Sequence, residues 1–119
     1  MMKKPLVFSA VAVVGLMALS TPAYAFDTMA CMACHTMDTV KLGPSMKAVV
    51  AAYGNENALA KVFESGFAVK DRKIASADPQ WTKKTTVMTL KYMQLIKGHE
   101  KEAAHALFET VKNGKFGNY

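Results

Sequence analysis

The chain of 119 residues carries a net charge of +6, with 51% hydrophobic and 20% charged residues. At about 100–200 residues per domain, this length leaves room for one domain, which excludes barrel enzymes and two-domain architectures. The composition and the lack of low-complexity runs exclude wholesale disorder. The two cysteines, in Cys31-Met32-Ala33-Cys34, are too few for a framework of several disulfides.

Residues 1–25 have the pattern of a secretory signal peptide. Lys3 and Lys4 form a positive start, an uncharged apolar run of 14 residues extends from Leu6 to Leu19, and Ala23-Tyr24-Ala25 is a small-x-small cleavage site. A membrane-spanning helix needs roughly 20 residues, so we predict a cleaved signal and no retained anchor. A single domain, 26–119, then follows, with 94 residues and a net charge of +4. The style of the signal is bacterial, and we predict a periplasmic protein.

The first half of this domain is predicted to be helical. Residues 26–37 form a short segment with helical character, and Pro44 is predicted as the first residue of the next helix. The apolar residues of that helix recur at the i, i+3, i+4, i+7 spacing of one face, and Gly54 ends it. The inward residues on this face are Met46, Val49, Val50 and Tyr53.

Another helix is predicted to follow, capped by Asn55 or Asn57 and stopped by Gly66. Its apolar stripe is Leu59, Val62 and Phe63. Residues 67–80 lack periodicity and contain Asp78-Pro79, so we predict a loop there.

Two helices are predicted in the last third of the chain. The first spans 85–96, with Val87 and Leu90 facing inward and Tyr92 or Ile96 as further inward candidates. After an interruption at Gly98, the second runs from about His99 to Lys112 and ends at Asn113-Gly114. Its stripe is Ala104, Leu107, Phe108 and Val111. No alternating strand pattern of useful length appears, so the sequence predicts an all-α fold.

Cys31-Met32-Ala33-Cys34-His35 matches Cys-x-x-Cys-His, the attachment signature of c-type haem. Two thiols one helical turn apart can reach the two vinyl groups of one porphyrin and form thioethers. The adjacent His35 can then present its imidazole to the iron as the proximal axial ligand. The sequence therefore predicts one covalent haem c on Cys31 and Cys34.

Three other interpretations of the cysteine pair are weaker. A thioredoxin-type redox pair needs a βαβ setting, and the sequence shows no strand pattern. A structural zinc site needs four ligands, but the two remaining histidines, His99 and His105, lie at the far end of the chain. A simple disulfide in an exported protein leaves His35 without a role.

This chain resembles the class I c-type cytochromes. The resemblance rests on the attachment signature, on Leu42-Gly43-Pro44-Ser45-Met46-Lys47-Ala48-Val49-Val50-Ala51-Ala52-Tyr53 and on a C-terminal helix, and it covers about two-thirds of the domain. It implies a small helical fold wrapped round one haem. It also implies that the carbonyl of Pro44 accepts a hydrogen bond from the free imidazole nitrogen of His35, which would fix the orientation of the ring.

The distal ligand of the iron has to be chosen among methionines, because no proline follows Pro79 to mark the proline-flanked methionine usual in this family. A thioether sulfur favours ferrous iron and suits an electron carrier. Met88 and Met93 lie between Trp81 and the last helix, where the family places its distal ligand. We predict Met88, seven residues after Trp81, with Met93 as the alternative. There are competing interpretations: either methionine could simply pack in the core, and the distal position of the iron could be taken by a histidine or stay open.

Three further side chains have two interpretations each. Trp81 is either a core residue or, by the resemblance, the donor of its indole N–H to a haem propionate. His99 and His105 are six residues apart and so lie on different sides of a helix, beside Glu100 and Glu102. We expect both histidines to be solvated surface residues rather than iron ligands.

The basic residues cluster at Lys70-Asp71-Arg72-Lys73 and at Lys83-Lys84. We expect a solvated face; the alternative is a lysine collar around an exposed haem edge, which would attract acidic redox partners. The clusters are short and lack interleaved aromatic residues, which argues against binding of nucleic acid.

The sequence therefore predicts a periplasmic monohaem cytochrome that carries single electrons between redox partners by Fe(III)/Fe(II) cycling. The alternative is a gas-binding or sensing haem protein for NO, CO or O2, with an open or unusual distal position. A further hypothesis is a homodimer or an oxidoreductase subunit, because only five residues precede Cys31 after cleavage and the short segment would leave apolar surface uncovered. With no second cofactor motif and no activated nucleophile, we do not expect an enzyme.

Overall fold

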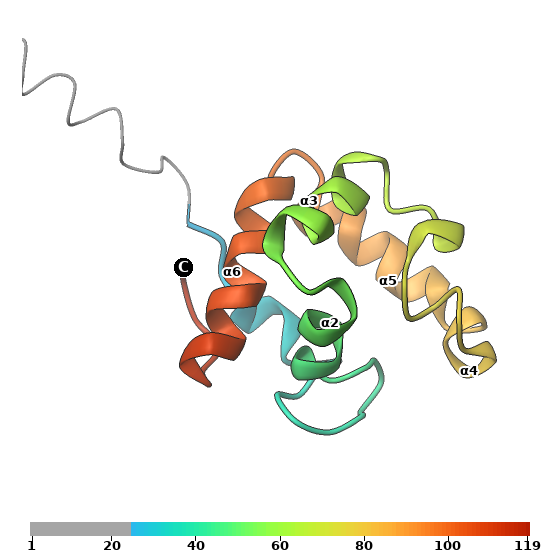
Figure 1. Cartoon of the computed structure of the whole chain (residues 1–119), viewed down its shortest axis with the longest axis horizontal. Helices are drawn as coiled ribbons and strands as arrows, with labels where there is room; N and C mark the ends of the chain where they lie inside the picture. Colours follow the sequence, from blue (N-terminus) through green and yellow to red (C-terminus); the bar gives the residue numbers. More distant parts are fainter. Residues whose placement is uncertain (1–24) are drawn as a thin grey trace, which may run out of the picture.

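The computed structural model describes residues 25–119, so the predicted signal peptide, apart from Ala25, lies outside the described residues. Within this range the protein is mostly helical and has no strand, which confirms the all-α class; an isolated antiparallel bridge pairs Asp27 with Asn118. None of the helices in this range is long and apolar enough to cross a membrane. The elements (Figure 1) are η1 (Thr28–Cys31), α2 (Met46–Tyr53), α3 (Glu56–Glu64), η2 (Val69–Asp71), α4 (Pro79–Thr82), α5 (Thr85–Lys91), η3 (Tyr92–Ile96) and α6 (Glu100–Asn113).

Helix α2 begins later than Pro44, so the prediction of Pro44 as the first helical residue is wrong. Ser45 is the N-cap, and its hydroxyl accepts a hydrogen bond from the amide of Ala48 at 3.1 Å. This bond satisfies one of the free amides of the first turn and thereby sets the start of the helix. Gly54 ends the helix in a positive-φ conformation, as predicted.

Helix α3 confirms most of its prediction. Asn55, rather than Asn57, is its N-cap and accepts a hydrogen bond from the amide of Ala58 at 2.9 Å. Leu59 and Phe63 are buried, which matches the predicted stripe. The chain leaves the helix at Gly66, whose φ of 102° favours glycine.

Residues 67–80 are not the uniform loop that we predicted. They contain the 3-10 turn η2, and the short helix α4 begins within them at Pro79. Asp78 caps this helix by accepting a hydrogen bond from the amide of Gln80 at 3.0 Å. Asp-Pro therefore acts here as an N-cap followed by a first helical residue, in which the fixed φ of proline suits the helix.

Helix α5 continues directly into η3, a π-helical turn, so the predicted helical range of 85–96 is confirmed. Its predicted inward face is confirmed only in part: Tyr92 and Ile96 are buried, and Val87 is 57% exposed but lines a cavity. Leu90 is 56% exposed and does not line that cavity. The helix turns the face that carries Tyr92 to the core. The wider π-helical turn then changes the direction in which the residues after Tyr92 point. Which face of this helix is buried therefore depends on the elements that pack against it.

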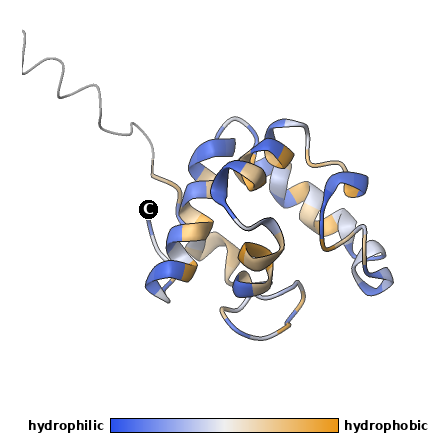
Figure 2. Cartoon of the chain, viewed as in Figure 1, coloured by the Kyte–Doolittle hydropathy of each residue, from blue (hydrophilic) through white to orange (hydrophobic). Residues whose placement is uncertain are grey.

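Helix α6 confirms its prediction, with Ala104 and Leu107 buried and Gly114 at its end. It packs against α3 (Figure 1), and hydrophobic and hydrophilic residues segregate around both helices (Figure 2). Ala103, Ala104 and Ala106 have no exposed surface, which allows close approach of the two backbones. The α3–α6 pair thus forms one side of the core.

The short segment before Cys31 packs along α6 and the last residues of the chain. Phe26 is buried, and its amide donates to the carbonyl of Tyr119 at 3.1 Å. The hydroxyls of Thr28 and Thr110, both fully buried, are hydrogen-bonded at 2.7 Å. These contacts fix the start of the Cys31–His35 segment relative to the core.

Candidate functional site

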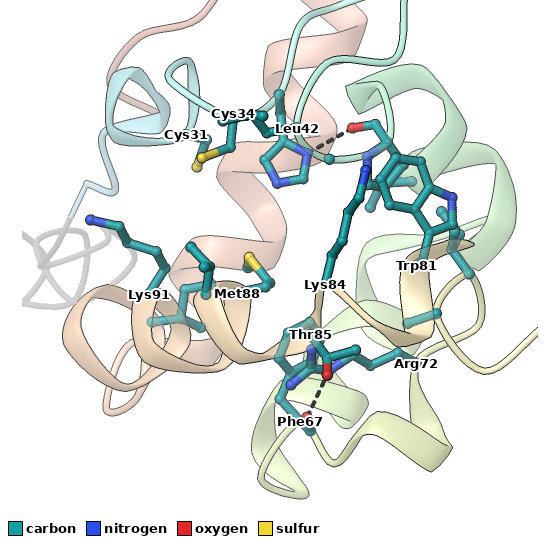
Figure 3. Close-up of a pocket in the computed structure, with 18 of the residues that line it drawn as sticks. Cys31, Cys34, Leu42, Phe67, Arg72, Trp81, Lys84, Thr85, Met88 and Lys91 are labelled. Atoms are coloured by element: carbon teal, nitrogen blue, oxygen red, sulfur yellow. Dashed lines mark hydrogen bonds between the residues drawn. The ribbon is translucent and has the colours of Figure 1, made fainter. Parts of the chain in front are cut away.

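A cavity of about 520 Å³ opens between the Cys31–His35 segment and α5. Figure 3 shows Cys31 and Cys34 on one side of it and Met88 on the α5 side, with the sulfur of Met88 turned toward the cysteines. Aromatic side chains from elsewhere in the chain complete the wall, among them Phe63, Phe67 and Trp81. The fold therefore brings the Cys-x-x-Cys-His segment and the predicted distal methionine to one mainly apolar cavity.

His35 is held by the loop that precedes α2. Its Nδ1 lies 2.6 Å from the carbonyl oxygen of Pro44, which can only accept, so Nδ1 carries the proton and Nε2 keeps its lone pair. Burial lowers the pKa of His35, against the opposing effect of the Pro44 carbonyl, and so favours the neutral ring. A neutral imidazole oriented through its second nitrogen is a suitable metal ligand.

Gly43 gives this ring its space. A Cβ at this position would lie 2.5 Å from Cε1 of His35, which is closer than any real Cβ contact. The amide of Gly43 also donates to the carbonyl of Cys34 at 2.8 Å, so the loop folds back on the cysteine segment. The Gly43-Pro44 pair thus positions His35 in two ways, because Gly43 leaves room for the ring and the Pro44 carbonyl accepts a hydrogen bond from its Nδ1–H.

Both cysteines line the cavity as free thiols. The pKa of Cys31 is raised to about 11 by burial and, to a smaller degree, by the charges of Asp27 and Cys34. A redox-active dithiol of the thioredoxin kind depends on a thiolate with a lowered pKa. The environment of Cys31 is therefore unlike that of such a redox pair.

Of the two methionines considered for the distal side, Met88 lines the cavity and Met93 is not among the residues that line it. Met93 follows Met88 by five residues, falls in the π-helical turn and is 53% exposed. A helical offset of five residues points the two side chains in different directions. The structure thus brings Met88, and not Met93, to the side of the cavity that faces the cysteines.

Arg72 lines the same cavity, although its cluster was expected to form a solvated face. It is only 5% exposed, and its Nε donates to the carbonyl of Phe67 at 2.9 Å. Its Nη2 donates to the hydroxyl of Thr89 at 2.7 Å. No carboxylate within the described part of the chain forms an ion pair with it, so this buried cation has only neutral partners.

Trp81 is buried and lines the cavity, which is compatible with both of its predicted roles. The Nζ of Lys84 lies 5.3 Å from the centroid of the Trp81 ring, and the two side chains run together at one edge of the cavity (Figure 3). Lys83 and Lys91 line the cavity as well, and all three lysines are exposed. A positive rim therefore borders the opening.

The remaining histidines lie elsewhere. His105 is exposed on α6, with its Nδ1 3.0 Å from a carboxylate oxygen of Glu56, and His99 is the N-cap residue of α6. Neither is among the residues that line the cavity. Between residues 25 and 119, no group of three or more His, Cys, Asp or Glu side chains is arranged to hold a metal ion.

Sequence reasoning missed Arg72 as a cavity residue and Gly43 as the neighbour of His35. No signal along the chain marks Arg72, because its cluster has the pattern of an ordinary charged run. Gly43 precedes Pro44, and its close contact to His35 depends on the folded loop.

Neither the protein-family models, nor the curated proteins, nor the solved structures with which we compared the chain gave a match.

Proposed function

We propose that this chain binds one haem c covalently through Cys31 and Cys34 and carries single electrons between periplasmic redox partners. One arrangement carries the proposal: two free thiols, a neutral imidazole and a thioether sulfur line the same apolar cavity. Under this proposal His35 is the proximal ligand of the iron and Met88 the distal one. A histidine–methionine ligand pair raises the reduction potential and is typical of electron carriers.

The size and polarity of the cavity suit such a group. Its volume of about 520 Å³ falls within the range of cofactor sites, which are mostly apolar with a few placed polar groups. The exposed side chains of Leu42 and Val87 line it, so a flat apolar ligand would cover surface that water otherwise contacts.

The charge at the cavity also suits a haem. A buried cation is costly unless an anion pairs with it, and Arg72 has neutral partners only. A haem propionate beside Arg72 would supply that negative charge, and the indole N–H of Trp81 is a second donor candidate. Both residues line the cavity, which supports their assignment to the propionate side.

A bound haem supplies the one-electron Fe(III)/Fe(II) chemistry. The chain orients the iron ligand, keeps water away from the cavity and places positive charge at its rim. The Pro44 carbonyl holds the ring of His35 in one orientation and increases its basicity, while the aromatic wall excludes water. The lysines at the rim would attract partners with acidic docking surfaces.

The proposal is tested on the chain produced in a bacterium with its own leader and isolated from the periplasm. We expect a coloured protein whose mass equals residues 26–119 plus one haem, and whose colour stays with the polypeptide after denaturation. The double variant Cys31→Ala/Cys34→Ala should lose the colour, and Met32→Ala, a control between the two cysteines, should keep it. A colourless wild-type protein with two free or mutually bonded thiols overturns the proposal.

A further inference from the structure

The strained residue of the structure lies beside the cavity. Phe67 has a φ of 57°, and it is the only non-glycine residue with a positive φ in the range 25–119. A bulky side chain rarely adopts this conformation, and it persists only where its surroundings over-determine it. Such strain often accompanies a functional site, so the contacts of Phe67 merit a functional explanation.

Arg72 and Tyr92 hold Phe67 in place. Arg72 donates from Nε to the carbonyl of Phe67, and its Cζ lies 3.9 Å from the centroid of the Phe67 ring. The ring of Tyr92 stacks on that of Phe67, with the centroids 5.2 Å apart. The strained residue is therefore fixed by a cation and by an aromatic ring from the turn that continues α5.

The same cluster reaches the helix that carries Met88. Arg72 donates from Nη2 to the hydroxyl of Thr89, the residue that follows Met88, at 2.7 Å. Tyr92, one turn after Met88, donates its hydroxyl to the carbonyl of Phe63 at 2.5 Å. Hydrogen bonds that involve a charged donor are stronger than neutral ones, which makes the Arg72–Thr89 bond the stronger of the two attachments.

Helix α5 depends on contacts outside itself, among them the packing of Met88 against the core. It is seven residues long, and no side chain caps its N-terminus at Lys84. Helices this short are marginal in isolation and depend on tertiary contacts. The placement of Met88 therefore depends on the contacts that anchor Thr89 and Tyr92.

From these contacts we infer that Phe67, Arg72, Thr89 and Tyr92 form a distal clasp, in which Arg72 and Thr89 are positioning residues that hold Met88 toward His35. The inference rests on the proposed function. It adds that the Arg72–Thr89 bond decides whether the distal side is closed by the thioether or open to an added ligand. With the clasp intact the chain would act as an electron carrier, and with the clasp broken it would bind an added gas at the iron.

The test compares Thr89→Val with Thr89→Ser in the haem-loaded mature protein. Valine keeps the branched shape of threonine and removes the hydroxyl, which accepts from Arg72 and also donates to the carbonyl of Thr85 at 2.9 Å. Serine keeps this hydroxyl at the same position. Arg72→Lys, which keeps the charge but loses the planar fork, is the second variant. The readouts are the absorption band that marks a Met–Fe(III) bond, the rate of CO binding to the ferrous protein, and amide hydrogen exchange over 85–91.

We expect Thr89→Val and Arg72→Lys to weaken the Met–iron band, to speed CO binding about tenfold and to speed exchange over 85–91 by a similar factor, since a hydrogen bond to a charged group is lost. Thr89→Ser, which keeps the hydroxyl, should match the wild type. Wild-type values in all three readouts for Thr89→Val overturn the clasp.

Failure of the proposed function gives a different pattern. A wild-type protein without a Met–iron band refutes the assignment of Met88, whatever the variants do. In that case the exchange data alone decide on the clasp. Faster exchange over 85–91 in Thr89→Val and in Arg72→Lys, but not in Thr89→Ser, supports it, and equal exchange in all three variants overturns it.

Discussion

Gly43 lies against the imidazole of His35 so closely that a Cβ atom would sit 2.5 Å from its Cε1. The next residue, Pro44, accepts the hydrogen bond from Nδ1 of the same ring. Two adjacent residues thus determine both where the ring lies and which of its nitrogens is free. The orientation of His35 is therefore a property of the 43–44 loop as much as of the cysteine segment.

Gly43→Ala should displace the ring and reduce the yield of haem-loaded protein. The position of the added methyl group is fixed by the backbone, so the ring must move, and overpacking of this kind costs about 1–3 kcal/mol of stability. Urea unfolding and the haem content per chain measure the two effects. Gly117→Ala is the control, since its Cβ would meet only Cε2 of Tyr119, at 3.9 Å. Equal haem content in both variants would contradict the role of Gly43.

Met88→Ala should abolish the Met–iron absorption band and lower the reduction potential, because the soft thioether ligand stabilises ferrous iron. It should also let CO bind to the ferrous protein without displacing a ligand. Met93→Ala, at an exposed position outside the cavity lining, is the matched control and should behave as the wild type. If only Met93→Ala changes the spectrum, the distal ligand is misassigned.

Thr28→Val should destabilise the protein by about 1–3 kcal/mol, because it leaves buried polar partners unsatisfied. The Thr28 hydroxyl bonds to that of Thr110 and also accepts from the amide of Gly117 at 3.0 Å. Thr110→Val removes one of these bonds only and should cost about 1 kcal/mol. Urea unfolding of both single variants and the double variant gives the coupling between them. Strictly additive losses would show that the pair does not act as a unit.

The hydrogen-bonded carboxylate of Glu100 should account for part of the loss of folding stability at low pH. Its carboxylate accepts the amide N–H of Gly98 at 2.9 Å, and this bond lowers the pKa of Glu100 below its ordinary value of 4.5. A lowered pKa in the folded state contributes stability that is fully present above 4.5 and is lost as the pH falls through the folded value. Glu100→Gln should therefore flatten the decline of Tm as the pH falls below 4.5.

Glu102→Gln is the control for this experiment, because it makes the same change of charge on the first turn of α6 and leaves the Glu100 carboxylate bonded to Gly98. The difference between the two variants isolates the bond. Identical Tm profiles in the two variants would assign the acid sensitivity to net charge alone.

Lys84→Gln and Lys91→Gln should slow oxidation of the ferrous protein by ferricyanide several-fold at low salt. Both lysines border the cavity, and a positive rim raises the local concentration of an anion. The effect should vanish at about 1 M salt, where the screening length is about 3 Å. Stopped-flow absorbance measures the rates, with Lys61→Gln on α3 as the control. An equal loss in the control would indicate that only the overall charge matters.

Local chemistry made several features of the fold predictable from the sequence. Asn55, Gly54 and Gly114 set helix ends, because caps and left-handed positions act through neighbouring backbone groups. The interpretation of Asp78-Pro79 as loop was wrong for a related reason: a capping residue before proline is also a helix start.

The inward face of α5 could not be predicted from its own residues. Val87 and Leu90 are both apolar and fall within the helix, but Val87 lines the cavity whereas Leu90 is exposed outside it. The buried core lies on the side of Tyr92, and the π-helical turn alters the phase of the residues after it. The apolar character of a residue makes its burial favourable, but it does not determine which element will pack against it.

For the candidate site, the sequence alone was enough to single out the Cys31–His35 segment, because its three candidate side chains are within five consecutive residues and their spacing is the whole signal. Only the tertiary structure decided that Met88 rather than Met93 reaches the cavity, that Arg72 is buried beside it, and that Gly43 touches His35. These residues come from segments far apart in the chain, and their contacts depend on how the helices pack, which no local pattern encodes.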